Sequence, residues 1–86
     1  MDELYNNYRE VTKDNLKRYL DRYVRAGKLS GDTRDGYVAL FADKFGGQAA
    51  RQYDFEKFVK ELGYRDQAHH VTKGDANRIA GLIAEA

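Results

Sequence analysis

Apolar residues recur every three or four positions along most of this chain, which is the periodicity of an amphipathic α-helix. The pattern is clearest over residues 12–27, where the apolar positions share one helical face: Leu16, Tyr19, Leu20, Tyr23 and Val24. Thr12 is a preferred N-cap residue, and Val11 before it can pack against Leu16 as a hydrophobic staple. The sequence therefore predicts a helix over 12–27.

The same spacing predicts three further helices. One covers about 30–45, with Ser30 as its cap, and ends at the glycine pair 46–47. A third carries the apolar positions Phe55, Phe58, Val59 and Leu62. It begins either at Asp54, as an N-cap, or about two turns earlier near Gln48. The last covers about 72–85.

The remaining segments are predicted to be short connections. Residues 63–71 are polar and are predicted to form a loop. The first ten residues could form a short helix through Leu4 and Tyr8 or extend the 12–27 helix backwards, and a short separate turn is favoured. We find no strand-like alternation of apolar and polar residues. The expected fold is all-α, a small compact bundle of about four helices, with residues 1–86 as a single domain. The expected core is Leu16, Leu20, Tyr23, Val24, Leu40, Phe41, Phe58, Val59, Leu62, Ile79, Leu82 and Ile83.

Composition narrows the class of protein. There is no cysteine, so neither a disulfide nor a cysteine zinc site can support the fold, and seven Tyr and four Phe must help to fill a small core. No apolar stretch is long enough to span a bilayer, and the acidic first residues do not resemble a secretory signal. We expect a soluble cytoplasmic protein that does not interact with membranes.

Residues that could support catalysis or bind a metal are few. His69 and His70 are adjacent in the polar loop and lack the spaced ligands that zinc requires, and Ser30, the only serine, is explained as a helix cap. No glycine-rich phosphate loop is present. The sequence therefore predicts a protein that is not an enzyme and that uses no metal or cofactor.

The charge distribution indicates where a partner could bind. The net charge is only +1, but residues 9–28 carry seven Lys or Arg against three acids. On a helix, Arg18, Arg22 and Arg25 share the side opposite the apolar face. Together with Lys17 and Lys28 they are the candidate partner-facing residues. An arginine stripe of this kind suits phosphates or an acidic protein surface.

A solvated face is the alternative interpretation of the same stripe. Asp14 lies four residues before Arg18, and Asp21 lies four residues before Arg25, in the order that favours helical ion pairs. Such pairs would neutralise two of the three arginines and leave Arg22 as the one without a nearby acid in sequence.

One short motif resembles a known family. Leu29-Ser30, Thr33, Tyr37 and Phe41 are similar to the Leu-Ser-x-x-Thr-x-x-x-Tyr-x-x-x-apolar pattern in the N-terminal core-binding domain of tyrosine recombinases. The resemblance covers about thirteen residues and implies a four-helix DNA clamp that carries the basic helix. Lys44 stands where that pattern has an aromatic residue, and the glycine pair 46–47 interrupts it.

These observations favour a small non-enzymatic regulator or inhibitor that acts by binding another protein, of the kind that bacteria and their phages encode. Tyr and Arg are abundant, and they supply many of the anchors that dominate protein interfaces. The alternative is a DNA- or RNA-binding helical module that uses the basic helix over 12–28.

Overall fold

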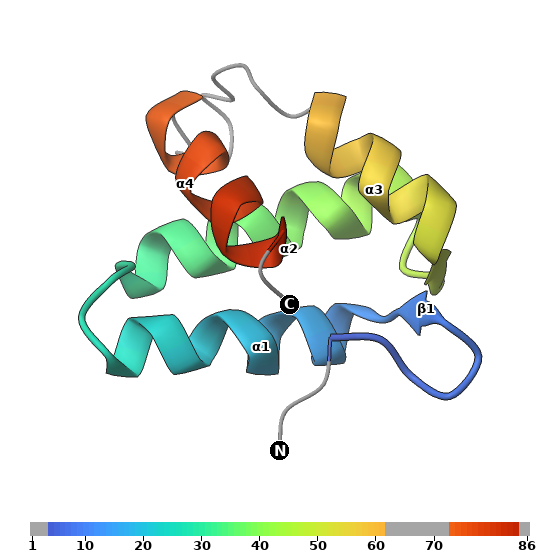
Figure 1. The fold of residues 1–86 in the computed structure, drawn as a ribbon, viewed down its shortest axis with the longest axis horizontal. Coiled ribbons are helices and arrows are strands. Elements are labelled where there is room, and N and C mark those ends of the chain that lie inside the picture. Colours follow the sequence, from blue (N-terminus) through green and yellow to red (C-terminus); the bar gives the residue numbers. More distant parts are fainter. Residues whose placement is uncertain (1–3, 62–72, 85–86) are drawn as a thin grey trace.

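The computed structural model describes residues 4–61 and 73–84 and consists mostly of helices (Figure 1). Its elements are β1 (Glu10–Val11), α1 (Lys13–Arg25), α2 (Gly31–Phe45), β2 (Ala50–Arg51), α3 (Gln52–Glu61) and α4 (Lys73–Ala84). The predicted all-α bundle of four helices is confirmed for these residues. The predicted loop over 63–71, including His69 and His70, lies outside them.

The first two helices form an antiparallel pair, lowest in Figure 1. Their starts follow from side-chain capping, because Thr12 Oγ1 accepts the Asn15 amide at 3.1 Å and Ser30 Oγ accepts the Thr33 amide at 3.0 Å. At the end of α2 the backbone turns through Gly46, whose φ of 61° lies in the left-handed region that glycine adopts without strain. Both helices therefore begin and end close to where the sequence predicts.

We expect Thr12→Ala to lower the free energy of unfolding by about 1 kcal/mol, because the Asn15 amide then loses its acceptor. Thr12→Ser is the matched control, since it keeps the hydroxyl and should change stability little. Urea denaturation of both variants measures the difference. An alanine variant as stable as the parent would contradict the capping role.

A two-stranded antiparallel ladder joins the N-terminal segment to the start of α3, with Glu10 opposite Arg51 and Val11 opposite Ala50. This corrects the expectation that no strand would form, because two-residue strands are too short to show alternation in sequence. The ladder also sets the start of α3 at Gln52, between the two predicted starts. Residues 50–51 must stay extended to pair, and the Gln52 amide donates to the Arg9 carbonyl at 3.0 Å.

The core lies where the helices meet, and it includes most of the predicted positions that the structure describes. Four predicted core residues, Tyr23, Val24, Val59 and Leu82, are only partly buried and pack at its edge, and Leu62 lies outside the described residues. Prediction missed several buried residues, which are Leu4, Val11, Tyr19, Leu29, Tyr37, Val38, Ala50, Phe55 and Ala76. Three of them, Leu4, Val11 and Ala50, belong to the segments around the ladder, whose pairing the sequence did not reveal.

Aromatic rings fill the centre of this core. Phe41 of α2 is fully buried, and its ring centroid lies 4.9 Å from Phe45, 5.9 Å from Phe55 and 6.1 Å from Phe58. Tyr37, one turn earlier on α2, packs edge-on against Phe58 at 5.9 Å. These contacts between rings hold α3 against α2.

Tyr37 carries a buried hydroxyl that has no hydrogen-bond partner among the described residues, and burial raises the pKa of this group. An unsatisfied buried hydroxyl costs about 1–3 kcal/mol. We therefore expect Tyr37→Phe to leave stability unchanged or to raise the free energy of unfolding by about 1 kcal/mol, as measured by thermal and urea denaturation. Tyr53→Phe, at a position 75% exposed, is the control. A clear loss of stability in Tyr37→Phe would mean that the hydroxyl is hydrogen-bonded.

Candidate binding groove

The five basic residues predicted to face a partner do not converge on one site. Lys17, Arg18, Arg22 and Arg25 lie exposed on α1, and Lys28 lies exposed in the turn after it. Arg18 donates to the Asn15 side chain, and the Nζ of Lys28 lies 6.0 Å from the centre of the Tyr23 ring. Of these five residues, Arg22 is the one that lines the groove described below.

Arg25 forms an ion pair with Asp21. The two residues form the predicted helical pair at 2.8 Å, and Asp21 also pairs with Arg34 of α2. The hydrogen bond from Arg25 lowers the pKa of Asp21, and Arg34 lowers it further. Asp14 forms no ion pair within the described part of the chain. One of the two predicted pairs, Asp21 with Arg25, is thus present within α1, and the additional pair of Asp21 with Arg34 links α1 to α2.

The groove that Arg22 lines is the candidate functional site, with a volume of about 920 Å³. It lies between the N-terminal segment, α1, α3 and α4. The N-terminal segment contributes Leu4, Tyr5 and Arg9, and α1 contributes Tyr19 and Arg22. From α3 come Gln52, Glu56, Val59 and Lys60, and from α4 come Asn77, Ala80, Ile83 and Ala84.

A tight loop over residues 6–10 places Arg9 at the edge of this groove. The Asn6 side-chain oxygen accepts the Tyr8 and Glu10 amides at 2.9 and 3.0 Å, and the Asn6 carbonyl accepts the Arg9 amide at 3.0 Å. Within this loop Arg9 has a φ of 59°, a left-handed conformation that is uncommon for a residue with a side chain. The loop backbone thus determines the direction in which the Arg9 side chain leaves.

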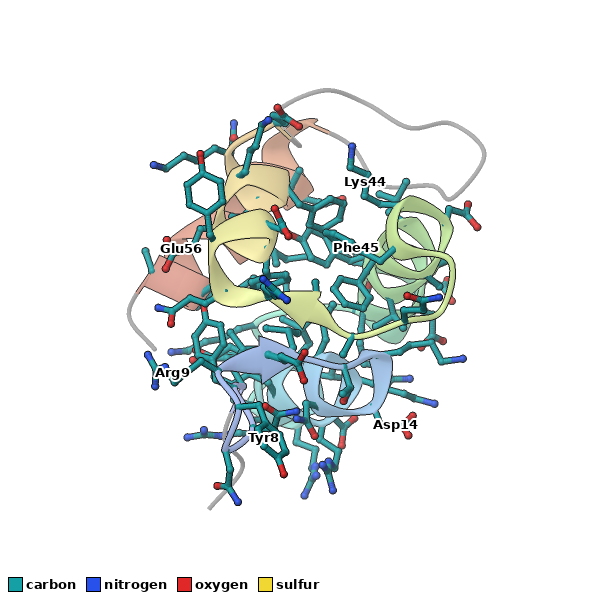
Figure 2. The ribbon with its side chains drawn as sticks, turned by 90° about the vertical axis from the view of Figure 1, so that its right-hand side faces the viewer. Tyr8, Arg9, Asp14, Lys44, Phe45 and Glu56 are labelled. Carbon is teal, nitrogen blue, oxygen red and sulfur yellow. The ribbon has the colours of Figure 1, made fainter. Side chains whose placement is uncertain are left out.

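The Arg9 side chain is then held by two neighbours. Its guanidinium lies over the Tyr5 ring at 5.2 Å, and its Nε donates to Gln52 Oε1 at 3.1 Å. Gln52 in turn donates to Glu56 Oε1 at 3.1 Å, so a chain of hydrogen bonds runs from the N-terminal loop along α3. Figure 2 shows Arg9 and Glu56 on the same edge of the molecule, on the opposite side from Asp14, Lys44 and Phe45.

Tyr5 lies beneath this arrangement. Its ring is half-buried and meets Phe55 edge-on at 6.3 Å. Burial raises the pKa of the Tyr5 hydroxyl and the Glu56 carboxylate raises it further, while Arg9 opposes the change. Tyr5 therefore stays neutral at physiological pH and serves as a platform for the Arg9 guanidinium.

Tyr19 and Arg22 form the wall opposite the N-terminal loop. The Tyr19 hydroxyl donates to the Leu82 carbonyl of α4 at 2.9 Å and lies 3.2 Å from the Tyr23 hydroxyl, which ties the C-terminal part of α4 to α1 (Figure 1). Arg22 lies over the Tyr19 ring at 5.9 Å. Two arginines on different segments are thus each packed on a tyrosine in the same groove.

The groove is apolar at its base and mainly basic at its edge. Leu4 and Ile83 are buried, and Val59 and Ala80 are half-buried. Among the described residues, the edge carries the exposed cations Arg9, Arg22 and Lys60 and the exposed acid Glu56. Such a surface suits a ligand that is both apolar and negatively charged.

Sequence analysis found Arg22 but missed the rest of this groove. Arg9 and Gln52 are 43 residues apart and meet only because β1 pairs with β2, and neither residue type is unusual in a sequence. Arg9 belongs to the basic segment over residues 9–28, but nothing in the sequence predicts its left-handed backbone conformation. No local pattern could have identified this site.

Ser30 and the potential metal ligands can be placed within residues 4–61 and 73–84. They contain no cluster of three or more His, Asp or Glu that could hold a metal ion, and Ser30 is engaged as the cap of α2, where its hydroxyl also donates to Thr33. No helix among them is long and apolar enough to cross a membrane. Comparison with protein-family models, curated proteins and solved structures finds no match to this chain.

Proposed function

We propose that this chain is a non-enzymatic binding protein that regulates or inhibits another protein, and that the groove between the N-terminal segment, α1, α3 and α4 is its binding surface. The observation that carries the proposal is the pair of arginines packed on tyrosines above an apolar base. Arginine is among the residue types that most often supply binding energy at protein interfaces, and here the tyrosine rings hold each guanidinium in place. We further propose a cytoplasmic location, which suits a fold without cysteine.

The low accessibility of the two tyrosine ring faces in the groove favours a protein over a nucleic acid as the ligand of this groove. Single-stranded nucleic acids bind by stacking bases on exposed aromatic faces. Tyr19 is only 4% exposed, and Tyr5 is half-buried with the Arg9 guanidinium over its ring. Neither ring offers a clear face to a base.

Nucleic-acid binding remains the second proposal, and it depends on a different surface. Lys17 and Arg18 are exposed on α1, where they do not line the groove. Cations in that position could contact a phosphate backbone without any role for the groove. The two proposals therefore assign binding to separate residues and can be separated by mutation.

The test is affinity capture from a lysate of the source organism, with and without nuclease. We expect a nuclease-resistant protein to be captured by the parent chain and by an outer-face variant with Lys17→Ala and Arg18→Ala. A groove variant with Arg9→Gly and Lys60→Ala removes the same charge and should lose that protein. Capture that disappears with nuclease, or that depends only on the outer-face residues, would replace the protein-binding proposal with the nucleic-acid one.

A further inference from the structure

Arg9 is positioned more firmly than a surface arginine needs to be. Its backbone has a φ of 59°, where glycine would be unstrained, yet the position carries a long cationic side chain. The Tyr5 ring and Gln52 Oε1 then fix the guanidinium from two directions. Strained backbone that is stabilised by its surroundings is common at ligand-binding positions.

The contacts that hold Arg9 leave the two terminal nitrogens of its guanidinium available to a ligand. Among the described residues, the guanidinium donates only from Nε, to Gln52. The two terminal nitrogens donate to no other described residue and form the planar fork that pairs with a carboxylate. Since the side chain is already ordered, binding a carboxylate costs less conformational entropy than it would at a mobile arginine.

The charges at the edge of the groove also favour a ligand with carboxylates. Among the described residues that line the groove, Arg9 and Lys60 are exposed cations and Glu56 is the exposed acid. Glu56 is fixed through Gln52 close to Arg9, so the local field near Arg9 is partly cancelled. Lys60 adds a second cation to the edge, so a ligand that carries carboxylates complements the charge of Arg9 and Lys60.

The base of the groove excludes a ligand that is only an anion. Val59 and Ala80 are half-buried beside the buried Ile83, so apolar surface lies directly below the charged edge. A phosphate or a polyanion would leave that surface wet, whereas an apolar side chain would cover it. Amphipathic peptide segments bind apolar grooves in this way, with anchors three or four residues apart.

We infer that the groove binds an acidic amphipathic segment of a partner protein, with a carboxylate on Arg9 and an apolar side chain against Val59 and Ile83. This inference rests on the proposed function and names the chemistry of the partner. Arg9 is then the residue that determines specificity, because its position is fixed before the ligand arrives.

The experiment is selection from a displayed library of random 16-residue peptides against the full chain, followed by fluorescence anisotropy with the selected peptides. We expect the selected sequences to be rich in Asp and Glu, with large apolar residues three or four positions apart. Replacing their acids with Gln or Asn, or their apolar anchors with Ala, should weaken binding at least about tenfold, as loss of an interface hot spot does.

Variants of the chain locate the binding. Arg9→Gly keeps the left-handed backbone without strain and should weaken the selected peptides at least about tenfold, while Arg9→Lys, which keeps the charge but loses the fork, should give a smaller loss. Glu56→Gln should bind at least as tightly as the parent, since it removes the acid beside the groove. Arg51→Ala is the matched control, because Arg51 is exposed in β2 and does not line the groove. Thermal unfolding verifies that each variant is folded.

Several results would overturn the inference. They are a library that yields no binder, selected peptides without acidic residues, equal binding to the parent and Arg9→Gly, and tighter binding of oligothymidylate than of any peptide. If the lysate experiment still shows a protein captured through the groove, only the acidic amphipathic partner is wrong and the proposed function stands. If groove-dependent capture fails as well, both proposals fall.

Discussion

Phe41→Ala is expected to lower the free energy of unfolding by about 3–5 kcal/mol, the range for a fully buried phenylalanine. The Phe41 ring is inaccessible to solvent and touches Phe45, Phe55 and Phe58, so its removal leaves a cavity between α2 and α3. A domain of this size has a total stability of roughly 4–13 kcal/mol. The variant should therefore be largely unfolded near physiological temperature if the parent lies in the lower part of that range.

Urea denaturation followed by circular dichroism measures this loss, with Tyr53→Ala as the control. Tyr53 is an aromatic residue of α3 but is 75% exposed, so its replacement should change stability by less than about 0.5 kcal/mol. A loss below about 1 kcal/mol for Phe41→Ala would mean that the aromatic cluster is not the centre of the core. The arrangement of α2 against α3 would then need revision.

Local chemistry explains why the helices could be predicted. The starts of α1 and α2 depend on Thr12 and Ser30, whose hydroxyls bond to amides three residues later, and the end of α2 depends on Gly46. Each of these interactions lies within a few residues of sequence. Apolar periodicity adds the buried face of each helix.

Pairing between distant segments explains what could not be predicted. The β1–β2 ladder is two residues long on each side, so it produces no alternation, yet it decides where α3 begins and where the loop over residues 6–10 lies. Buried Val11 and Ala50 belong to the same ladder. Core positions contributed by these segments were therefore missed. The helical faces supplied the predicted core residues, although Tyr19, Tyr37, Val38, Phe55 and Ala76, which also lie on helices, were not among them.

The candidate groove depends on the same pairing. In the sequence, a stripe of arginines is visible at helical spacing on one helix, α1. Folding divides that stripe, because Arg25 is neutralised by Asp21 on the side toward α2, while Arg22 lies on the side toward α4. Arg22 shares the groove with Arg9, which comes from a loop that the ladder places beside the start of α3. The charge pattern of the sequence thus indicated that this protein has a basic surface, but it did not show which residues come together in the groove.

Ile79→Ala tests the wall that completes this groove, and we expect it to lower the free energy of unfolding by about 2–5 kcal/mol. Ile79 is fully buried on α4, one turn before Ile83 of the groove base. Arg78→Ala is the matched control, because Arg78 is the preceding residue of the same helix but is exposed, and its replacement should cost less than about 0.5 kcal/mol. Urea denaturation compares the two variants, and equal stabilities would show that α4 does not pack on the bundle through this face. The groove would then lose one wall, and binding through it would have to be explained by the N-terminal segment, α1 and α3 alone.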